Sequence, residues 1–208
     1  MAVRKHMETE KKNKGYTLIE LVIVVAIFTI LLGILSPSLN AIPYFRMRRA
    51  AGSVNEALKR TKTEAMNRLV GEMKLEWKEN DGYYISYYLD RGKVGGTSHV
   101  QQDQPEKIAP ANLAVTYTDD QGITYDLRKT DSHALILTYD RASGAFRPIQ
   151  SQVVTQELIL SDLEAGKDVT FYPIRRNQYC QKITVTAGNH SRSVVLNQKA
   201  GTCQLVNE

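Results

Sequence analysis

One acidic residue lies inside a long apolar run. From Leu18 to Leu35, Glu20 is the only charged residue. A carboxylate near the interior of a membrane costs about 2.5–3.5 kcal/mol on insertion scales, so it needs a partner. Glu20 is therefore the first candidate functional residue, and the alternative is a charge that is tolerated near a helix end.

The residues before this run are polar and basic. Residues 1–15 contain five Lys and Arg against Glu8 and Glu10, a net charge of +3. Basic residues that precede an apolar run stay in the cytoplasm, so the part of the chain after the run lies on the outer side of the membrane. The charge distribution therefore predicts an inward N-terminus.

The rest of the chain offers little chemistry. The four His residues are scattered, and no nucleophile elbow, metal-binding helix or phosphate loop is present. Cys180 and Cys203 have no His at a metal-ligand spacing. We therefore expect no enzyme activity, no metal and no cofactor.

The net charge of +5 is unevenly distributed. Residues 40–70 carry +5 and residues 171–208 carry +4, whereas residues 71–170 carry 10 basic against 16 acidic residues and so −6. This distribution does not indicate a uniformly basic nucleic-acid binder.

The elements that position Glu20 begin with the apolar run itself. Its 21 residues from Tyr16 to Ser36 span about 30 Å as a helix, the thickness of a hydrocarbon core. We predict a transmembrane helix over 16–37, with a kink at Pro37, where a backbone hydrogen bond is lost. Small and apolar residues then recur every three or four positions, which predicts an amphipathic helix over 38–70. They are Ala50, Val54, Ala57, Thr61, Ala65 and Leu69.

The period changes to two after Gly71. Alternation over 73–77, the turn Asn80-Asp81-Gly82 and the run 83–89 predict a β-hairpin. Residues 90–110 are expected to form a loop. Further β-like runs, arranged as an antiparallel meander, are expected at 113–118, 123–128, 134–139, 153–160, 169–172, 182–187 and 193–197. The predicted fold is α+β, with a long N-terminal helix packed on an antiparallel β head over 71–208.

The junction Lys14-Gly15-Tyr16-Thr17-Leu18-Ile19-Glu20-Leu21 closely resembles the class III signal of type IV prepilins and pseudopilins. The resemblance implies that prepilin peptidase removes the leader 1–15 by cutting between Gly15 and Tyr16, and that Tyr16 is then N-methylated. Tyr16 departs from the usual Phe but keeps an aromatic ring. The resemblance also implies that Glu20 pairs with the N-terminal amine of a neighbouring subunit during filament assembly.

The pattern over 61–77, a helix end followed by a strand, resembles minor pilins and H-type pseudopilins and favours a minor subunit. The implied partners are prepilin peptidase, other pilin or pseudopilin subunits, the inner-membrane assembly platform and membrane lipid. The implied location is the inner membrane, with the head outside, followed by extraction into a filament. The sequence leaves open whether that filament serves a type IV pilus, type II secretion or competence.

Two features of the C-terminal third each leave two interpretations. Cys180 and Cys203 would lie outside the membrane, where a disulfide adding about 3 kcal/mol is permitted, or they remain free thiols. The basic residues there either contact DNA phosphates in a DNA-uptake filament or form a solvated surface. These residues are Arg175, Arg176, Lys182, Arg192 and Lys199.

One other class of function fits the same pattern. The chain could be an uncleaved single-pass anchor that displays an extracellular binding domain. In that case the mature protein would still begin near Met1 or Met7, which mass spectrometry of the membrane form distinguishes from a chain that begins at Tyr16.

Overall fold

The computed structural model describes residues 16–94, 97–166 and 171–207, without the side chains of 34–41, 91–98 and 163. The predicted leader, including Gly15, lies outside the described residues. The chain divides into two compact units, residues 1–41 and 42–208, which are considered separately below.

The helix α1 (Leu18–Asn67) contributes to both units. In the first unit its side chains from Leu18 to Gly33 are all exposed, and nearly all of them are apolar. Within the described residues, no helix is both long enough and apolar enough to cross a membrane. The span predicted over 16–37 continues into side chains outside the described part, so it stays a prediction. The backbone is helical at Pro37, and the kink expected there also stays a prediction.

In the second unit, α1 buries the stripe of small residues. Ala50, Val54, Ala57, Thr61 and Ala65 are at most 4% exposed. Their spacing places them on one helix face, and their small side chains let the sheets approach that face closely. The predicted amphipathic pattern is confirmed for these five positions. Leu69, the sixth, lies beyond the end of the helix.

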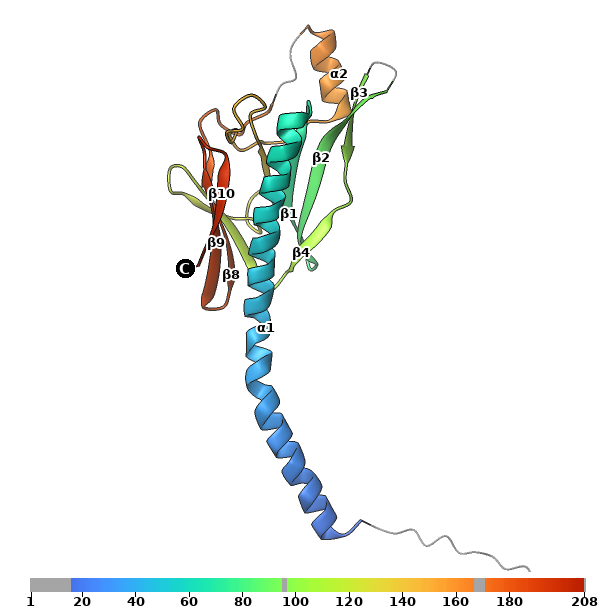
Figure 1. Cartoon of the computed structure of the whole chain (residues 1–208), viewed down its shortest axis with the longest axis vertical. Helices are drawn as coiled ribbons and strands as arrows, with labels where there is room; N and C mark the ends of the chain where they lie inside the picture. Colours follow the sequence, from blue (N-terminus) through green and yellow to red (C-terminus); the bar gives the residue numbers. More distant parts are fainter. Residues whose placement is uncertain (1–15, 95–96, 167–170, 208) are drawn as a thin grey trace, which may run out of the picture. The chain divides into compact units, whose positions relative to one another are not determined.

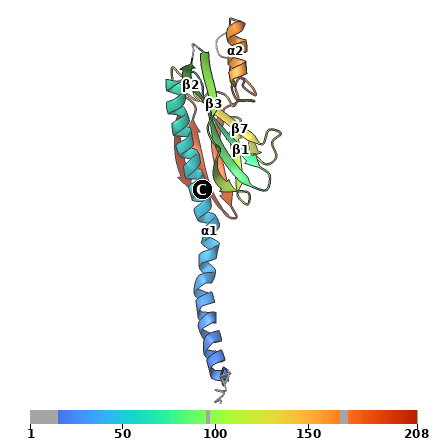
Figure 2. The same ribbon diagram turned by 90° about the vertical axis from the view of Figure 1, so that its right-hand side faces the viewer.

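A five-stranded antiparallel sheet, the first sheet, follows directly on the helix. Its order is β3-β2-β1-β7, and β4 pairs with β2 next to β3. Figure 1 labels β1 to β4, and Figure 2 also labels β7. The predicted hairpin is β1 and β2, with Trp77 opposite Tyr83. The strand bounds are β1 (Gly71–Lys78), β2 (Gly82–Val94), β3 (Thr97–Gln102), β4 (Glu106–Pro110) and β7 (Ala134–Thr138).

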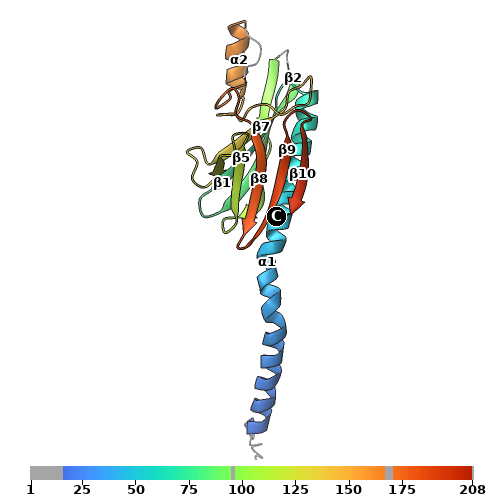
Figure 3. The ribbon, with the colours of Figure 1, turned by 90° about the vertical axis from the view of Figure 1, so that its left-hand side faces the viewer.

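The second sheet is also antiparallel and has the order β10-β9-β8-β5-β6 (Figure 3). The strand bounds are β5 (Ala114–Asp119), β6 (Thr124–Asp126), β8 (Cys180–Ala187), β9 (His190–Asn197) and β10 (Thr202–Asn207). Figure 1 shows the helical part of this unit between β8–β10 and the strands β1, β2 and β4. The fold is therefore α+β, as predicted.

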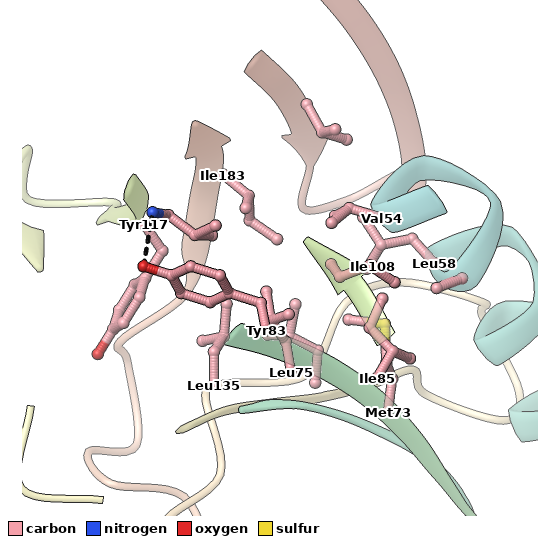
Figure 4. Close-up of a cluster of buried hydrophobic side chains, with 14 of the residues drawn as sticks. Val54, Leu58, Met73, Leu75, Tyr83, Ile85, Ile108, Tyr117, Leu135 and Ile183 are labelled. Carbon is pink, nitrogen blue, oxygen red and sulfur yellow. Dashed lines mark hydrogen bonds between the residues drawn. The ribbon is translucent and has the colours of Figure 1, made fainter. Parts of the chain in front are cut away.

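The core is shared by α1 and the two sheets. Val54 and Leu58 from the helix, Leu75 from the first sheet and Ile183 from the second sheet are fully buried in one cluster (Figure 4). Tyr83 joins the sheets with its hydroxyl, which donates to the Leu113 carbonyl at 3.1 Å and accepts from the Val115 amide at 3.3 Å. The sheets are therefore held together by hydrogen bonds as well as by apolar packing.

Three segments differ from the sequence-based expectations. The loop expected over 90–110 contains the end of β2 together with β3 and β4, because polar residues at a sheet edge satisfy their backbone by pairing. The strand expected over 153–160 is largely the helix α2 (Gln156–Glu164), which begins after Thr155. The strand β10 was not predicted at all, and the run expected at 169–172 lies partly outside the described residues.

The segment that leads into α2 covers a buried acid on the outer face of the first sheet. Glu72 is 0% exposed, and one of its carboxylate oxygens accepts the Val154 amide at 2.7 Å. Val70, Val154 and Ile159 form a small apolar cluster around this point. Burial raises the pKa of Glu72 to about 7, despite this hydrogen bond and the nearby Arg147 cation.

Candidate functional site

The N-terminus of α1 is capped by a reciprocal pair of hydrogen bonds between side chains and backbone amides. The Thr17 hydroxyl accepts the Glu20 amide at 3.3 Å, and a Glu20 carboxylate oxygen accepts the Thr17 amide at 2.9 Å. The same oxygen accepts the Thr17 hydroxyl at 3.0 Å. This arrangement is a capping box, because the first amides of a helix have no partner within the helix itself. Glu20 therefore faces back toward the residue that would become the mature N-terminus.

The charge of Glu20 also suits its position in the helix. It lies in the first turn of α1, where the aligned peptide dipoles favour a negative charge. Tyr16, which is 90% exposed, lies one residue before Thr17. Tyr16, Glu20, Leu21, Val24 and Val25 line an open hollow of about 440 Å³ on the helix surface. An acid and an apolar surface thus meet at one site.

The surface around this site is apolar on all sides of the helix. Every large apolar side chain from Leu18 to Leu32 is at least 49% exposed in the single chain. A helix that is apolar all round is normally covered by other protein or by lipid. This part of α1 therefore requires a covering that the described residues do not provide.

The two cysteines are free thiols in the structure. They lie on β8 and β10, which are separated by β9. Adjacent strands lie about 4.8 Å apart, so two strand spacings exceed the roughly 7 Å that a disulfide allows between Cα atoms. The disulfide considered between Cys180 and Cys203 is therefore not formed, and the free-thiol interpretation holds for this structure.

The structure does not gather the five basic residues considered for DNA contact. Lys182 pairs with Val195 and Arg192 pairs with Val185, which places the two basic side chains on opposite faces of the second sheet. Lys199 lies in the turn after β9, at the other end of that strand from Arg192. Arg175 and Arg176 are exposed in the segment before β8. A single DNA-binding face made of these residues is therefore not supported.

Sequence reasoning selected Glu20 and Tyr16 but missed Thr17. The signal was present, because Thr-x-x-Glu directly before an apolar run is the sequence pattern of a capping box. The predicted cleavage residue Gly15 lies outside the described residues. The site that can be described is therefore Tyr16, Thr17 and Glu20 with the apolar surface that follows them.

Comparison with known proteins gives one match. Residues 11–36 match a family model described as the prokaryotic N-terminal methylation motif. No curated protein and no solved structure matches the chain. The matched range includes the Gly15-Tyr16 junction, the capping box and most of the exposed apolar surface.

Proposed function

We propose that this chain, whose residues 11–36 carry the signal of type IV pilins and pseudopilins, is a filament subunit of the minor pilin or pseudopilin kind. The signal implies processing by a prepilin peptidase and assembly with other pilins. It also implies a protein that is first anchored in the membrane and then associated with a filament. The motif marks a structural protein and not an enzyme family.

The observation that carries this proposal is the exposed apolar stretch of α1 with one acid held at its start. The exposed side chains from Leu18 to Leu32 require lipid before assembly and neighbouring helices afterwards. Glu20 would then pair with the amine of a neighbouring subunit. Cleavage between Gly15 and Tyr16 creates that amine, and N-methylation of Tyr16 leaves it positively charged.

The finer organisation follows from the same proposal. Residues 1–15 are the leader, 16–37 the membrane and assembly helix, 38–70 the amphipathic helix and 71–208 the head. Pro37 loosens the helix between the membrane and assembly segment and the amphipathic segment. The free thiols are compatible with a minor subunit, because the chain lacks the tight paired-cysteine loop of many major pilins. The inner-membrane assembly platform completes the set of partners.

The first experiment is mass spectrometry of the full chain, expressed in membranes with and without an active prepilin peptidase. With the peptidase, we expect a mature chain that begins at Tyr16 and carries one added methyl group. Without it, we expect the intact leader. A chain that keeps its leader in the presence of active peptidase overturns the proposal and favours the uncleaved membrane anchor.

The second experiment separates pairing from helix capping. Glu20→Ala should be cleaved normally but lost from the filament fraction, because it removes the acid that meets the neighbouring amine. Thr17→Val is the matched control, because it removes the capping hydroxyl and keeps the Glu20 carboxylate. Equal loss of incorporation in both variants would mean that Glu20 acts by capping its own helix and not by pairing.

A further inference from the structure

We propose that a cavity between α1 and the turn from β9 to β10 binds a phosphate group. The cavity has a volume of about 300 Å³, and its lining includes Lys59, Lys62, Tyr139, Thr202 and Cys203. No carboxylate is among its described lining residues. Figure 3 shows β10 beside the helix, and the Cys203 thiol donates to the Asn55 carbonyl of α1 at 3.7 Å. The cavity lies within the second unit and is separate from the start of α1.

The two ammonium groups at this cavity are held in place. Lys62 donates to the Ala200 carbonyl at 2.9 Å, and Lys59 pairs with Glu56 at 2.9 Å. An ammonium group has three donors, so one such bond orients each lysine and leaves donors for a ligand. The cavity therefore has two oriented ammonium groups at its rim, of which Lys59 is paired with Glu56 and Lys62 has no carboxylate partner among the described residues.

The turn that holds Lys62 depends on a glycine. Gly201 has a φ of +56°, in the left-handed region that favours glycine. A Cβ atom on Gly201 would lie 1.7 Å from the Gly144 carbonyl oxygen. The turn can therefore close against residue 144 only with glycine at 201, and this closure brings the neighbouring Ala200 carbonyl to Lys62.

Tyr139 also lines the cavity. It is 2% exposed, and its hydroxyl has no hydrogen-bond partner among the described residues. A buried hydroxyl without a partner is costly, so an acceptor in the cavity would be favoured. Burial raises the pKa of Tyr139, which keeps the hydroxyl protonated and able to donate.

The thiol at the cavity is compatible with an anion. Burial raises the pKa of Cys203, so the thiol stays neutral near neutral pH, while Lys59 and Lys62 lower this pKa and Glu56 raises it. Phosphate has several acceptor oxygens, and lysines bind it as point charges from different directions. The set of two ammonium groups and hydroxyl donors therefore fits phosphate chemistry.

Cys203 provides the readout for the test. The full chain in detergent micelles is labelled with N-ethylmaleimide while inorganic phosphate is titrated at constant ionic strength with chloride. Cys203 is partly exposed, whereas Cys180 is 3% exposed and serves as the unlabelled internal control. We expect phosphate to slow the labelling of Cys203 in a saturable manner.

Three variants locate the effect. Tyr139→Phe keeps the buried ring and should weaken phosphate binding about tenfold, as expected for one lost hydrogen bond to a charged group. The double variant Lys59→Gln, Lys62→Gln should abolish protection. Lys107→Gln, on β4 and outside the cavity, should behave as the unchanged chain.

Two further ligands identify the source of the phosphate. Glycerol phosphate tests a soluble compound, and phosphatidylglycerol added to the micelles tests a lipid headgroup. Protection by either one supports the site, and the one that acts at the lower concentration is the preferred source. The proposal is overturned if phosphate does not protect Cys203, or if it protects Tyr139→Phe with unchanged affinity.

Discussion

At the residue scale, the start of α1 shows which functional side chains a sequence reveals. Glu20 was found because a lone charge in an apolar run is costly unless it has a partner. Thr17 was missed because an uncharged residue in such a run is not unusual. Its spacing from Glu20 nevertheless matches the pattern of a capping box. The two residues act together, since each satisfies the backbone amide of the other.

Removal of the Thr17 side chain should loosen the first turn of α1. In Thr17→Ala the Glu20 amide loses its acceptor, and we expect amide hydrogen exchange over residues 18–21 to become about fivefold faster, as is typical of a lost N-cap. Exchange in the second unit, for example over β1, should not change and is the control. Equal exchange at 18–21 in both chains would show that the capping box does not hold this turn.

Glu72 is a residue that the sequence does not distinguish from its neighbours. It alternates with apolar residues in the same way as Lys74 and Glu76, and this pattern alone does not distinguish a buried acid from one on the solvent side of the hairpin. The segment before α2 instead covers it and donates the Val154 amide to it. The segment that buries Glu72 lies about 80 positions later in the chain, so no local sequence pattern indicates this burial.

The raised pKa of Glu72 predicts a stability that depends on pH. The folded chain holds this proton up to a pH of about 7, whereas an unfolded chain releases it near 4.5. The contribution of Glu72 to the free energy of unfolding is therefore greatest below pH 4.5. It falls by up to about 3 kcal/mol as the pH rises to about 7. Urea unfolding between pH 5 and pH 8 measures this loss.

Two variants test the assignment to Glu72. Glu72→Gln keeps an acceptor for the Val154 amide and removes the titration, so its stability should fall less over this range than that of the unchanged chain. Glu76→Gln, on the same face of β1, should retain the original dependence on pH. The assignment is wrong if both variants keep the original slope.

At the element scale, prediction succeeded where a pattern was long and failed where pairing decided the structure. The stripe from Ala50 to Ala65 repeats over four turns and correctly indicated one buried helix face. In contrast, Val153 and Val154 suggested a strand, but α2 begins directly after Thr155. The polar strands β3 and β4 are formed by pairing with β2, and their own composition gives no sign of this.

The small residues of the stripe set how closely the helix approaches the sheets. Ala57 is 3% exposed, so Ala57→Leu adds atoms to a closed core and should lower the free energy of unfolding by about 1–3 kcal/mol. Arg49→Leu, at an exposed position of the same helix, should change it by much less. Chemical denaturation of both variants measures the difference, and equal values would contradict close packing at Ala57.

At the scale of the whole molecule, the two units differ in what stabilises them. The large core cluster lies entirely within residues 42–208 and includes α1 as well as both sheets. The described side chains before residue 34 are all exposed. The sequence predicts a change within the helix, from the apolar segment 16–37 to the amphipathic segment 38–70, and a head over 71–208, and this division into segments stays a prediction.

The second unit should therefore fold without the first. We expect a fragment of residues 42–208 to be soluble and monomeric and to unfold cooperatively, because it keeps the complete core. A fragment of residues 71–208, which lacks the helical stripe, should aggregate, since it exposes the apolar faces that α1 covers. Size-exclusion chromatography and circular dichroism distinguish these outcomes, and a stable 71–208 fragment would show that the helix is dispensable to the core.

The capping box bears on how reversible assembly would be. In the single chain the Glu20 carboxylate already accepts two hydrogen bonds from Thr17. Both bonds reach the same carboxylate oxygen, so pairing with a neighbouring amine would either use the other oxygen or replace a bond from Thr17. The contact would select the position at which a subunit enters, while most of the cohesion would come from apolar contact. A filament built in this way can release its subunits as well as add them.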